Sequence, residues 1–515
     1  MKKQLLYLTI TVLFLGWGYG CSKDLDEKHL SFPALSPVKT DVDAGTWKPI
    51  LLTAPDEFSV AAPVATTSPA YIAELNEIKG WQGKLSQKQK DIIKYWSAGA
   101  VLRWNEILRE LVALHNLPPY QKEDGTYPAP SANNPFAYPV FPFANPPYAA
   151  RAYAYVTAAQ YDALVAAYHF KKLYNRSAPY RVDSSVNAMV AKSDLPSYPS
   201  EDGTVIGVTV ELLKLLFPAD LAYIQQKADE HKLYRIWSGA NVRSELDAGE
   251  QLGKAVAQKF TARARTDRAG TAGGNPAIWA QFEKETAAKG EIPWISYESP
   301  KRPPMLPLFG KVRAFLFDSA TLVAIRPPAP PSTGSAQFKK ELEEVAYYSK
   351  NPTRERMRIV HFWGDGINTP TPPGHWNQIA AEEFVTLQLS EVRWARNLAL
   401  LNMAMSDGAI ACWDAKFFYF NPRPSAVDNS IKTLTGLPNF PSYTSGHSTF
   451  SGAAATVLGH IMPGKASQFK EMAQEASLSR LYGAIHYRSD IEAGMKCGET
   501  VGAFAVERAK LDGAE

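Results

Sequence analysis

The chain has 515 residues, of which 45% are hydrophobic and 21% are charged. This balance is typical of a soluble globular protein that buries a substantial core. The formal net charge of +4 is small for this length, so we expect no nucleic-acid partner. Only Cys21, Cys412 and Cys497 are present, too few for a zinc cluster.

Residues 1–20 have the pattern of a targeting segment. Lys2 and Lys3 precede an apolar core that is too short for a typical membrane span. The core ends at Gly20-Cys21 and is followed by a charged tract, which resembles a lipoprotein signal with lipidation at Cys21. We therefore predict an exported protein at the outer membrane or cell surface that meets the membrane only through this anchor. An ordinary cleaved signal, which would leave a periplasmic protein, is the alternative.

The remainder of the chain divides into three regions. Residues 21–75, rich in Pro, Ser, Thr and Ala, predict a tether and an extended segment. Residues 76–335 predict an N-terminal helical region, and residues 336–515 a C-terminal catalytic helix bundle. A Pro-rich connection at 291–333 is expected to wrap over the surface, because its aromatic residues need burial.

Helical periodicity dominates both large regions, and no internal repeat or sustained alternation is present. The fold should therefore be all-α, a helix bundle with long Pro-rich loops and the site inside it. The expected helices cover 87–115, 149–174, 203–216, 221–233, 242–266, 337–349, 352–363, 376–404, 406–419, 447–461, 466–482 and 491–511.

Three polar clusters lie within the last part of this region. Their cations, hydroxyl and histidines suit a tetrahedral oxyanion, because arginine forks bind adjacent oxygens and lysine adds a point charge. The first contains Lys416 and Arg423, the second Ser445, Gly446 and His447, and the third Arg480, His486 and Asp490.

The spacing within the clusters suggests how they are used. Ser445 and Gly446 precede an apolar helix, which would point backbone N–H groups and a positive dipole end at the anion. His486 and Asp490 are four residues apart, so on a helix the carboxylate can fix the tautomer of the ring. Taken alone, that pair has a purely structural alternative. For Arg480 to converge with His486, a helix must end or bend at Gly483.

Together the clusters match Lys-x6-Arg-Pro, Ser-Gly-His and Ser-Arg-x5-His-x3-Asp, which resembles the type 2 phosphatidic acid phosphatase superfamily, including the vanadium-dependent haloperoxidases. Thr444 departs from the proline usual in that family. Trp413 and Phe440 resemble the halide-pocket aromatics of fungal vanadium chloroperoxidase, although ordinary aromatic packing also explains them. The segment 361–377 resembles long bacterial members of the haloperoxidase branch, which the length of the chain also favours.

The resemblance implies a haloperoxidase with vanadate as cofactor and hydrogen peroxide, halide and a small organic acceptor as partners. His486 would be the axial vanadium ligand, oriented by Asp490, and His447 the acid–base residue. The oxyanion oxygens would be held by Lys416, Arg423, Ser445, Gly446 and Arg480. The sequence leaves the halide and the oligomeric state open.

Two rival functions remain. A phosphatase would use the same residues, with His486 attacking phosphorus and His447 protonating the leaving group. A glycan-binding surface lipoprotein would explain residues 1–30 but not the three clusters. Cys412 and Cys497 flank the site, where either a disulfide or two buried free thiols can be accommodated.

Overall fold

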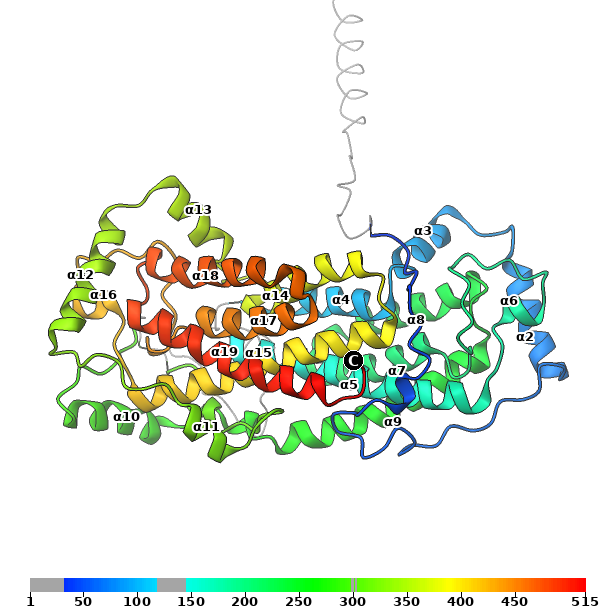
Figure 1. Cartoon of the computed structure of the whole chain (residues 1–515), viewed down its shortest axis with the longest axis horizontal. Coiled ribbons are helices and arrows are strands. Elements are labelled where there is room, and N and C mark those ends of the chain that lie inside the picture. The colour runs from blue at the N-terminus through cyan, green and yellow to red at the C-terminus, as the bar shows by residue number, and fades with distance from the viewer. Residues whose placement is uncertain (1–31, 118–144, 298–300, 302) are drawn as a thin grey trace, which may run out of the picture. The chain divides into compact units, whose positions relative to one another are not determined.

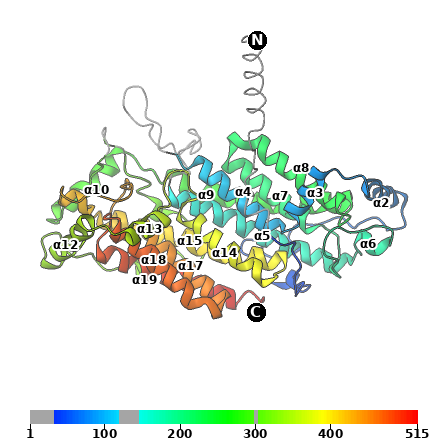
Figure 2. The same ribbon diagram turned by 90° about the horizontal axis from the view of Figure 1, so that it is seen from above.

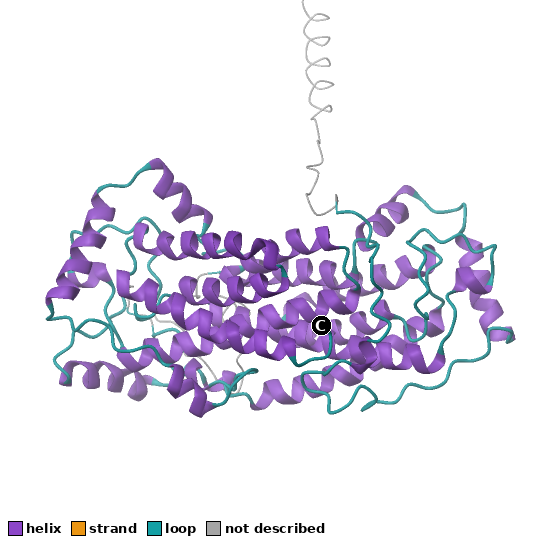
Figure 3. Ribbon diagram, viewed as in Figure 1, coloured by secondary structure: helices purple, strands orange, loops and turns teal. Residues whose placement is uncertain are grey.

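The computed structural model describes residues 32–117, 145–297, 301 and 303–515. The chain separates into two compact units, residues 1–33 and 34–515, and the second contains every described helix. Within the described residues all regular elements are helices, as predicted from the sequence, and none of them is long and apolar enough to cross a membrane (Figure 3). The predicted signal peptide and Cys21 lie outside the described residues.

The N-terminal helices include one large correction. The stripe at 87–115 predicted one helix, but the chain breaks at Gly99, whose φ of 126° is a conformation that favours glycine. Another helix, which begins at Pro69, starts inside the region that was predicted to be a tether. The elements are α2 (Pro69–Trp81), α3 (Gln87–Trp96), α4 (Ala100–His115), α5 (Pro146–Tyr174), α6 (Pro179–Val182), α7 (Glu201–Leu216), α8 (Leu221–Trp237), α9 (Arg243–Thr266), α10 (Pro276–Ala288) and α11 (Ser319–Ile325).

The C-terminal helices match the predicted ones except between 376 and 419. There the chain turns at 385–390 and one helix continues to Tyr419, so the predicted break near residue 405 is wrong. Asp407 is tolerated inside this helix because its carboxylate accepts the backbone N–H groups of Phe315 and Leu316. The elements are α12 (Ala336–Lys350), α13 (Arg354–Phe362), α14 (Thr371–Phe384), α15 (Glu391–Tyr419), α16 (Pro424–Val427), α17 (Gly446–Ile461), α18 (Ala466–Tyr482) and α19 (Arg488–Lys510).

Two 29-residue helices, α5 and α15, pack against each other and are buried along most of their length. The tyrosine stripe of α5 belongs to the core, as predicted. Helices α17 and α19 pack on α15, and the three lie side by side in both views (Figures 1 and 2). The Pro-rich connection also behaves as expected at Trp294 and Phe309, which are buried.

The contact between α17 and α19 depends on a row of small residues. A Cβ added to Gly498 would lie 2.1 Å from the carbonyl oxygen of Thr449, and one added to Gly494 would lie 2.7 Å from that of Ser445. Both distances are shorter than any real carbon–oxygen contact, so the two backbones touch. The Ser445 N–H also donates to the Asp490 carbonyl at 2.9 Å. The start of α17 is thereby held against the start of α19.

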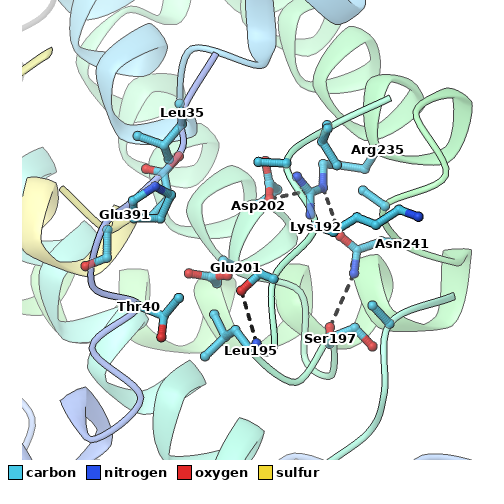
Figure 4. A pocket seen from close by; sticks show the side chains of 18 of the residues that line it. Leu35, Thr40, Lys192, Leu195, Ser197, Glu201, Asp202, Arg235, Asn241 and Glu391 are labelled. Carbon is cyan, nitrogen blue, oxygen red and sulfur yellow. Dashed lines mark hydrogen bonds and ion pairs between the residues drawn. The ribbon is translucent and has the colours of Figure 1, made fainter. Parts of the chain in front are cut away.

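A buried carboxylate lies at the other end of α15. Glu391 accepts the backbone N–H groups of Ala100 and Val101 at 2.5 and 3.1 Å, and so caps α4. Glu201, Asp202 and Glu391 line one cavity of about 320 Å³ (Figure 4). Burial and the neighbouring Asp202 raise the pKa of Glu391 to about 8.

This raised pKa predicts a pH-dependent stability. Glu391 binds a proton more tightly in the folded than in the unfolded chain. The stabilisation of the folded state by this proton is therefore complete below the ordinary pKa of Glu391. It is lost as the pH rises through about 8. We expect Glu391→Gln, which keeps an acceptor oxygen without the charge, to gain stability relative to wild type between pH 5 and pH 9. The gain should be at least about 1.4 kcal/mol, the value of one pKa unit.

Urea unfolding at the two pH values measures this difference, with Glu471→Gln as the control because Glu471 is exposed. A Glu391→Gln variant that followed the wild-type pH dependence would show that Glu391 is not the group responsible.

Candidate active site

The structure brings the three clusters together. Lys416 lies in the last turn of α15, Arg480 in the last turn of α18, and His447 in the first turn of α17. Ser445 and Gly446 lie at the start of α17, and Asp490 lies in the first turn of α19. Arg423 and His486 come from the segments that precede α16 and α19. Lys416, Arg423, Ser445, Arg480, His486 and Asp490 are all at most 3% exposed. We call the group formed by Lys416, Arg423, Ser445, Gly446, Arg480 and His486 the anion site.

His486 is oriented by a carboxylate, as its spacing from Asp490 predicted. Its Nδ1 lies 2.8 Å from Asp490 Oδ2, which therefore assigns the ring proton to Nδ1. The Nε2 lone pair is left facing Arg423, whose Nη1 lies 3.0 Å away. Asp490 Oδ2 also accepts from the Ser442 hydroxyl at 2.5 Å. A histidine fixed in this way presents one nitrogen as a ligand or nucleophile.

Lys416 and Arg423 are anchored by backbone carbonyls. The Lys416 ammonium donates to the carbonyls of Pro441 and Ser442 at 2.8 and 2.9 Å. The Arg423 guanidinium donates to the carbonyls of Phe440 and Ile485 at 3.0 and 2.8 Å. Its Nη2 is buried and has no hydrogen-bond partner among the described residues. A buried cationic donor without an acceptor is the group that a bound oxyanion would satisfy.

Arg480 reaches the site because α18 ends where the spacing required. The helix stops at Tyr482 with Gly483 as its C-cap, and Ala484 follows in the left-handed region with a φ of 57°. Arg480 donates from Nε to Ser479 Oγ at 2.8 Å and from Nη2 to the Trp363 carbonyl at 2.6 Å. The chain then turns, so that Arg480 and His486 lie on the same side of the site.

The second cluster forms the N-terminus of α17. Ser445 is the N-cap and accepts the N–H of Ser448 at 3.3 Å, and Gly446 is the first helical residue. The N–H groups of a first helical turn have no intrahelical acceptor, and the helix dipole is positive there. This arrangement supplies backbone donors for an anion, which Gly446 leaves accessible.

The electrostatics of the site favour an anion. Three basic side chains, Lys416, Arg423 and Arg480, are buried here, and the carboxylates of Asp490 and Asp365 offset part of their charge. Burial lowers the pKa of Arg423 and of Arg480 to about 10 and depresses that of Lys416 as well. Burial and these cations also hold the pKa of His486 well below its usual range, which favours the neutral ring whose Nε2 accepts from Arg423.

The two predicted halide-pocket residues are in contact with each other and with a cation. The rings of Trp413 and Phe440 are 5.0 Å apart, and the Lys416 ammonium lies 4.9 Å from the centre of the Phe440 ring. Trp413 donates its indole N–H to the Met305 carbonyl at 3.1 Å. Two apolar rings beside a buried ammonium provide a small, partly dehydrated environment next to the anion site.

Two residues of this region were not predicted from the sequence. Ser442 bridges toward Asp490, and Asp365 places its Oδ2 3.5 Å from His447 Nε2. Both lie in irregular segments, where no periodicity points to them. The sequence pointed to Asp365 only through the resemblance of the whole segment 361–377 to other proteins. That resemblance does not single out one residue of the segment. Cys412 and Cys497 are buried free thiols, so the possible disulfide is absent.

Comparison with known proteins agrees with this geometry. Residues 397–510 match the model of the PAP2 superfamily. This segment belongs to that superfamily. It contains every residue of the anion site.

Relatives of two kinds match part of this chain in sequence. A non-specific acid phosphatase of Salmonella typhi is 26% identical over 189 residues, which cover 35% of this chain and 66% of the phosphatase. The vanadium chloroperoxidase of Curvularia inaequalis is 28% identical over 141 residues, which cover 21% of this chain and 23% of that protein. This chain therefore spans less than two thirds of either relative.

Solved structures cover more of the chain than the sequence relatives do. The crystal structure of the first bacterial vanadium-dependent iodoperoxidase aligns with 79% of this chain and 96% of its own, with 25% identity and a TM-score of 0.57. A bacterial vanadium-dependent chloroperoxidase in its holo form aligns with 75% of this chain and 96% of its own, with 12% identity and a TM-score of 0.51. The chain described here therefore has the all-helical fold of these haloperoxidases.

Proposed function

We propose that this protein is a vanadate-dependent haloperoxidase that oxidises a halide with hydrogen peroxide. The observation that carries the proposal is the extent of the structural similarity. The iodoperoxidase structure aligns with 79% of the chain and 96% of its own length, and this alignment extends beyond the PAP2 region at 397–510. The contact of Trp413, Phe440 and Lys416 places two aromatic rings beside a cation of the anion site, where we propose that the halide binds.

The residues present fit vanadate. The Arg423 Nη2 without a partner, the Lys416 ammonium and the Arg480 guanidinium would neutralise its oxygens, and the first turn of α17 would add backbone donors. His486 would hold it through Nε2, with its other nitrogen held by Asp490. Vanadate, when bound, would supply a Lewis acid that polarises hydrogen peroxide for attack by a halide.

His447 would act as the acid–base residue. Burial and Arg480 lower its pKa to about 4, so at neutral pH the ring is unprotonated and accepts a proton from the incoming peroxide. Asp365 faces Nε2 of the ring and would stabilise the charged imidazolium that results. The same ring would then return the proton to the departing product.

A phosphatase is the second candidate, favoured by the sequence similarity to the acid phosphatase. The neutral Nε2 of His486 has the orientation that a nucleophile needs, and His447 has the position of an acid that protonates a leaving group. Phosphate and vanadate are both tetrahedral oxyanions and need the same cationic and N–H hydrogen-bond donors. The anion site alone therefore does not distinguish the two reactions.

One assay separates them. Purified protein loaded with vanadate should oxidise iodide, bromide or chloride with hydrogen peroxide, and phosphate should inhibit loading by competition for the same donors. Hydrolysis of p-nitrophenyl phosphate is measured on the vanadate-free protein. Strong phosphatase turnover with no halide oxidation between pH 5 and pH 9 would decide for the phosphatase.

A further inference from the structure

The carboxylate of Asp365 is shared by two histidines. Its Oδ1 lies 2.9 Å from His375 Nδ1, and its Oδ2 lies 3.5 Å from His447 Nε2. Only the first contact is a hydrogen bond, and both Asp365 Oδ2 and His447 Nε2 lack a hydrogen-bond partner among the described residues. The carboxylate is therefore bound on the side that faces away from the proposed reaction.

The segment that carries Asp365 is tied down at both ends. Trp363, two residues before it, accepts a hydrogen bond from Arg480 through its carbonyl. On the other side, Asn116 donates to the carbonyls of Gly366 and Thr369 at 2.7 and 3.0 Å. Asp365 itself has a φ of 45°, so a tight turn presents its side chain. The backbone at Asp365 thus has little freedom, and the position of its carboxylate depends on its side-chain partners.

His375 is held in a fixed orientation. Its ring stacks on Trp363 at a centroid distance of 4.7 Å and meets the edge of Phe362 at 5.0 Å. It belongs to the first turns of α14, whose start is buried. These contacts aim Nδ1 at Asp365, so the ring acts as a rigid donor.

The charged groups around His447 come from three elements. They are Asp365 on the segment before α14, His375 on α14 and Arg480 on α18. Arg480 and His375 oppose a positive charge on His447, and Asp365 favours one. Burial tends to raise the pKa of Asp365, but its hydrogen bond to His375 and the nearby His447 ring hold that pKa below its usual range. Asp365 is thus an anion whose charge the two histidines share.

We propose that His375 is a positioning residue for His447, because it binds one oxygen of Asp365 and so limits how strongly the other oxygen can pair with His447. The inference rests on the proposed role of His447 in proton transfer. Without the His375 donor, the carboxylate would be free to close the 3.5 Å gap and hold a proton on His447. His447 would then stay protonated up to a higher pH, so fewer rings could accept a proton from peroxide at the acidic end of the pH range.

Two substitutions distinguish the effect of the His375 Nδ1 donor from the effect of the packing of its ring. His375→Phe keeps an aromatic ring between Phe362 and Trp363 but removes Nδ1. His375→Asn removes the ring but places an amide N–H group near the position of Nδ1. We expect the Phe variant to raise the pKa of His447 by about one unit, a tenfold change in proton affinity, and the Asn variant to keep the wild-type value.

The measurement is a pH titration of histidine ring signals by ¹H–¹⁵N NMR on vanadate-free protein labelled at histidine, with His447→Gln assigning the signal. In the Phe variant the acidic limb of the pH–activity profile should move by the same amount. An unchanged His447 titration in the Phe variant overturns the proposal, as does an equal or larger shift in the Asn variant. Because the NMR reads the vanadate-free protein, absence of halide oxidation would count against the proposed function and not against this coupling.

Discussion

We expect the His486→Ala variant to lose the oxyanion, with a dissociation constant for vanadate about a hundredfold or more above that of wild type. Replacement of a partner of a metal ligand alone costs roughly 10- to 100-fold in affinity, and here the proposed ligand itself is removed. The Nε2 of His486 is neutral and faces the Arg423 guanidinium, so no other described side chain offers an equivalent lone pair at that point. Isothermal titration with vanadate measures the effect.

Two further variants sharpen this test. Asp490→Asn should weaken binding less, because the amide keeps the shape but no longer fixes the Nδ1–H tautomer. His460→Ala is the matched control, since His460 pairs with Glu515 outside the site. Wild-type affinity in His486→Ala would show that this histidine is not the ligand.

The His447→Ala variant should show the opposite behaviour, retaining the anion but losing turnover. General acid–base catalysis contributes roughly 10²- to 10⁴-fold, and we expect a decrease in kcat within this range. The affinity for vanadate should change little, because the cations of the anion site and His486 remain in place. Steady-state kinetics with iodide and peroxide, combined with vanadate titration, measure both quantities. Weak anion binding together with normal turnover of the bound fraction would reverse the roles assigned to the two histidines.

Much of the anion site was predictable because its residues lie in short clusters with a local geometric rule. The four-residue spacing of His486 and Asp490 allowed a hydrogen bond across one helical turn. The structure has this bond at 2.8 Å, although His486 lies just before α19. The six-residue spacing of Arg480 and His486 required a helix end at Gly483, which is where α18 stops. Pro422 excluded a continuous helix to Arg423, and α15 ends at Tyr419.

The residues that were not predicted have partners far away in the sequence. Asp365 meets His447 across 82 positions, and its turn carries no hydrophobic period. Ser442 reaches Asp490 from an irregular segment, and Lys416 is held by carbonyl groups, which any residue type provides. Contacts of this kind depend on how loops are folded back, and single-sequence patterns do not record that.

The errors in the fold have related causes. The apolar residues before and after Gly99 keep a helical period, so the periodicity at 87–115 does not reveal a break. The helix ends there because Gly99 alone has a non-helical backbone, with a φ of 126°. Conversely, Ser406 and Asp407 suggested a helix end, but α15 continues through them. There the tertiary contact to Phe315 and Leu316 outweighs the weak helix propensity.

The direct backbone contact between α17 and α19 limits how this site can change. Ser445 and Asp490 belong to opposite halves of the site, and no compressible layer of side chains lies between their helices at Gly494 and Gly498. Even a single methyl group there would push the helices apart and separate the backbone donors from His486. Directed evolution of this site should therefore leave the contact at Gly494 and Gly498 untouched and take its diversity from the loop segments that carry Arg423 and His486.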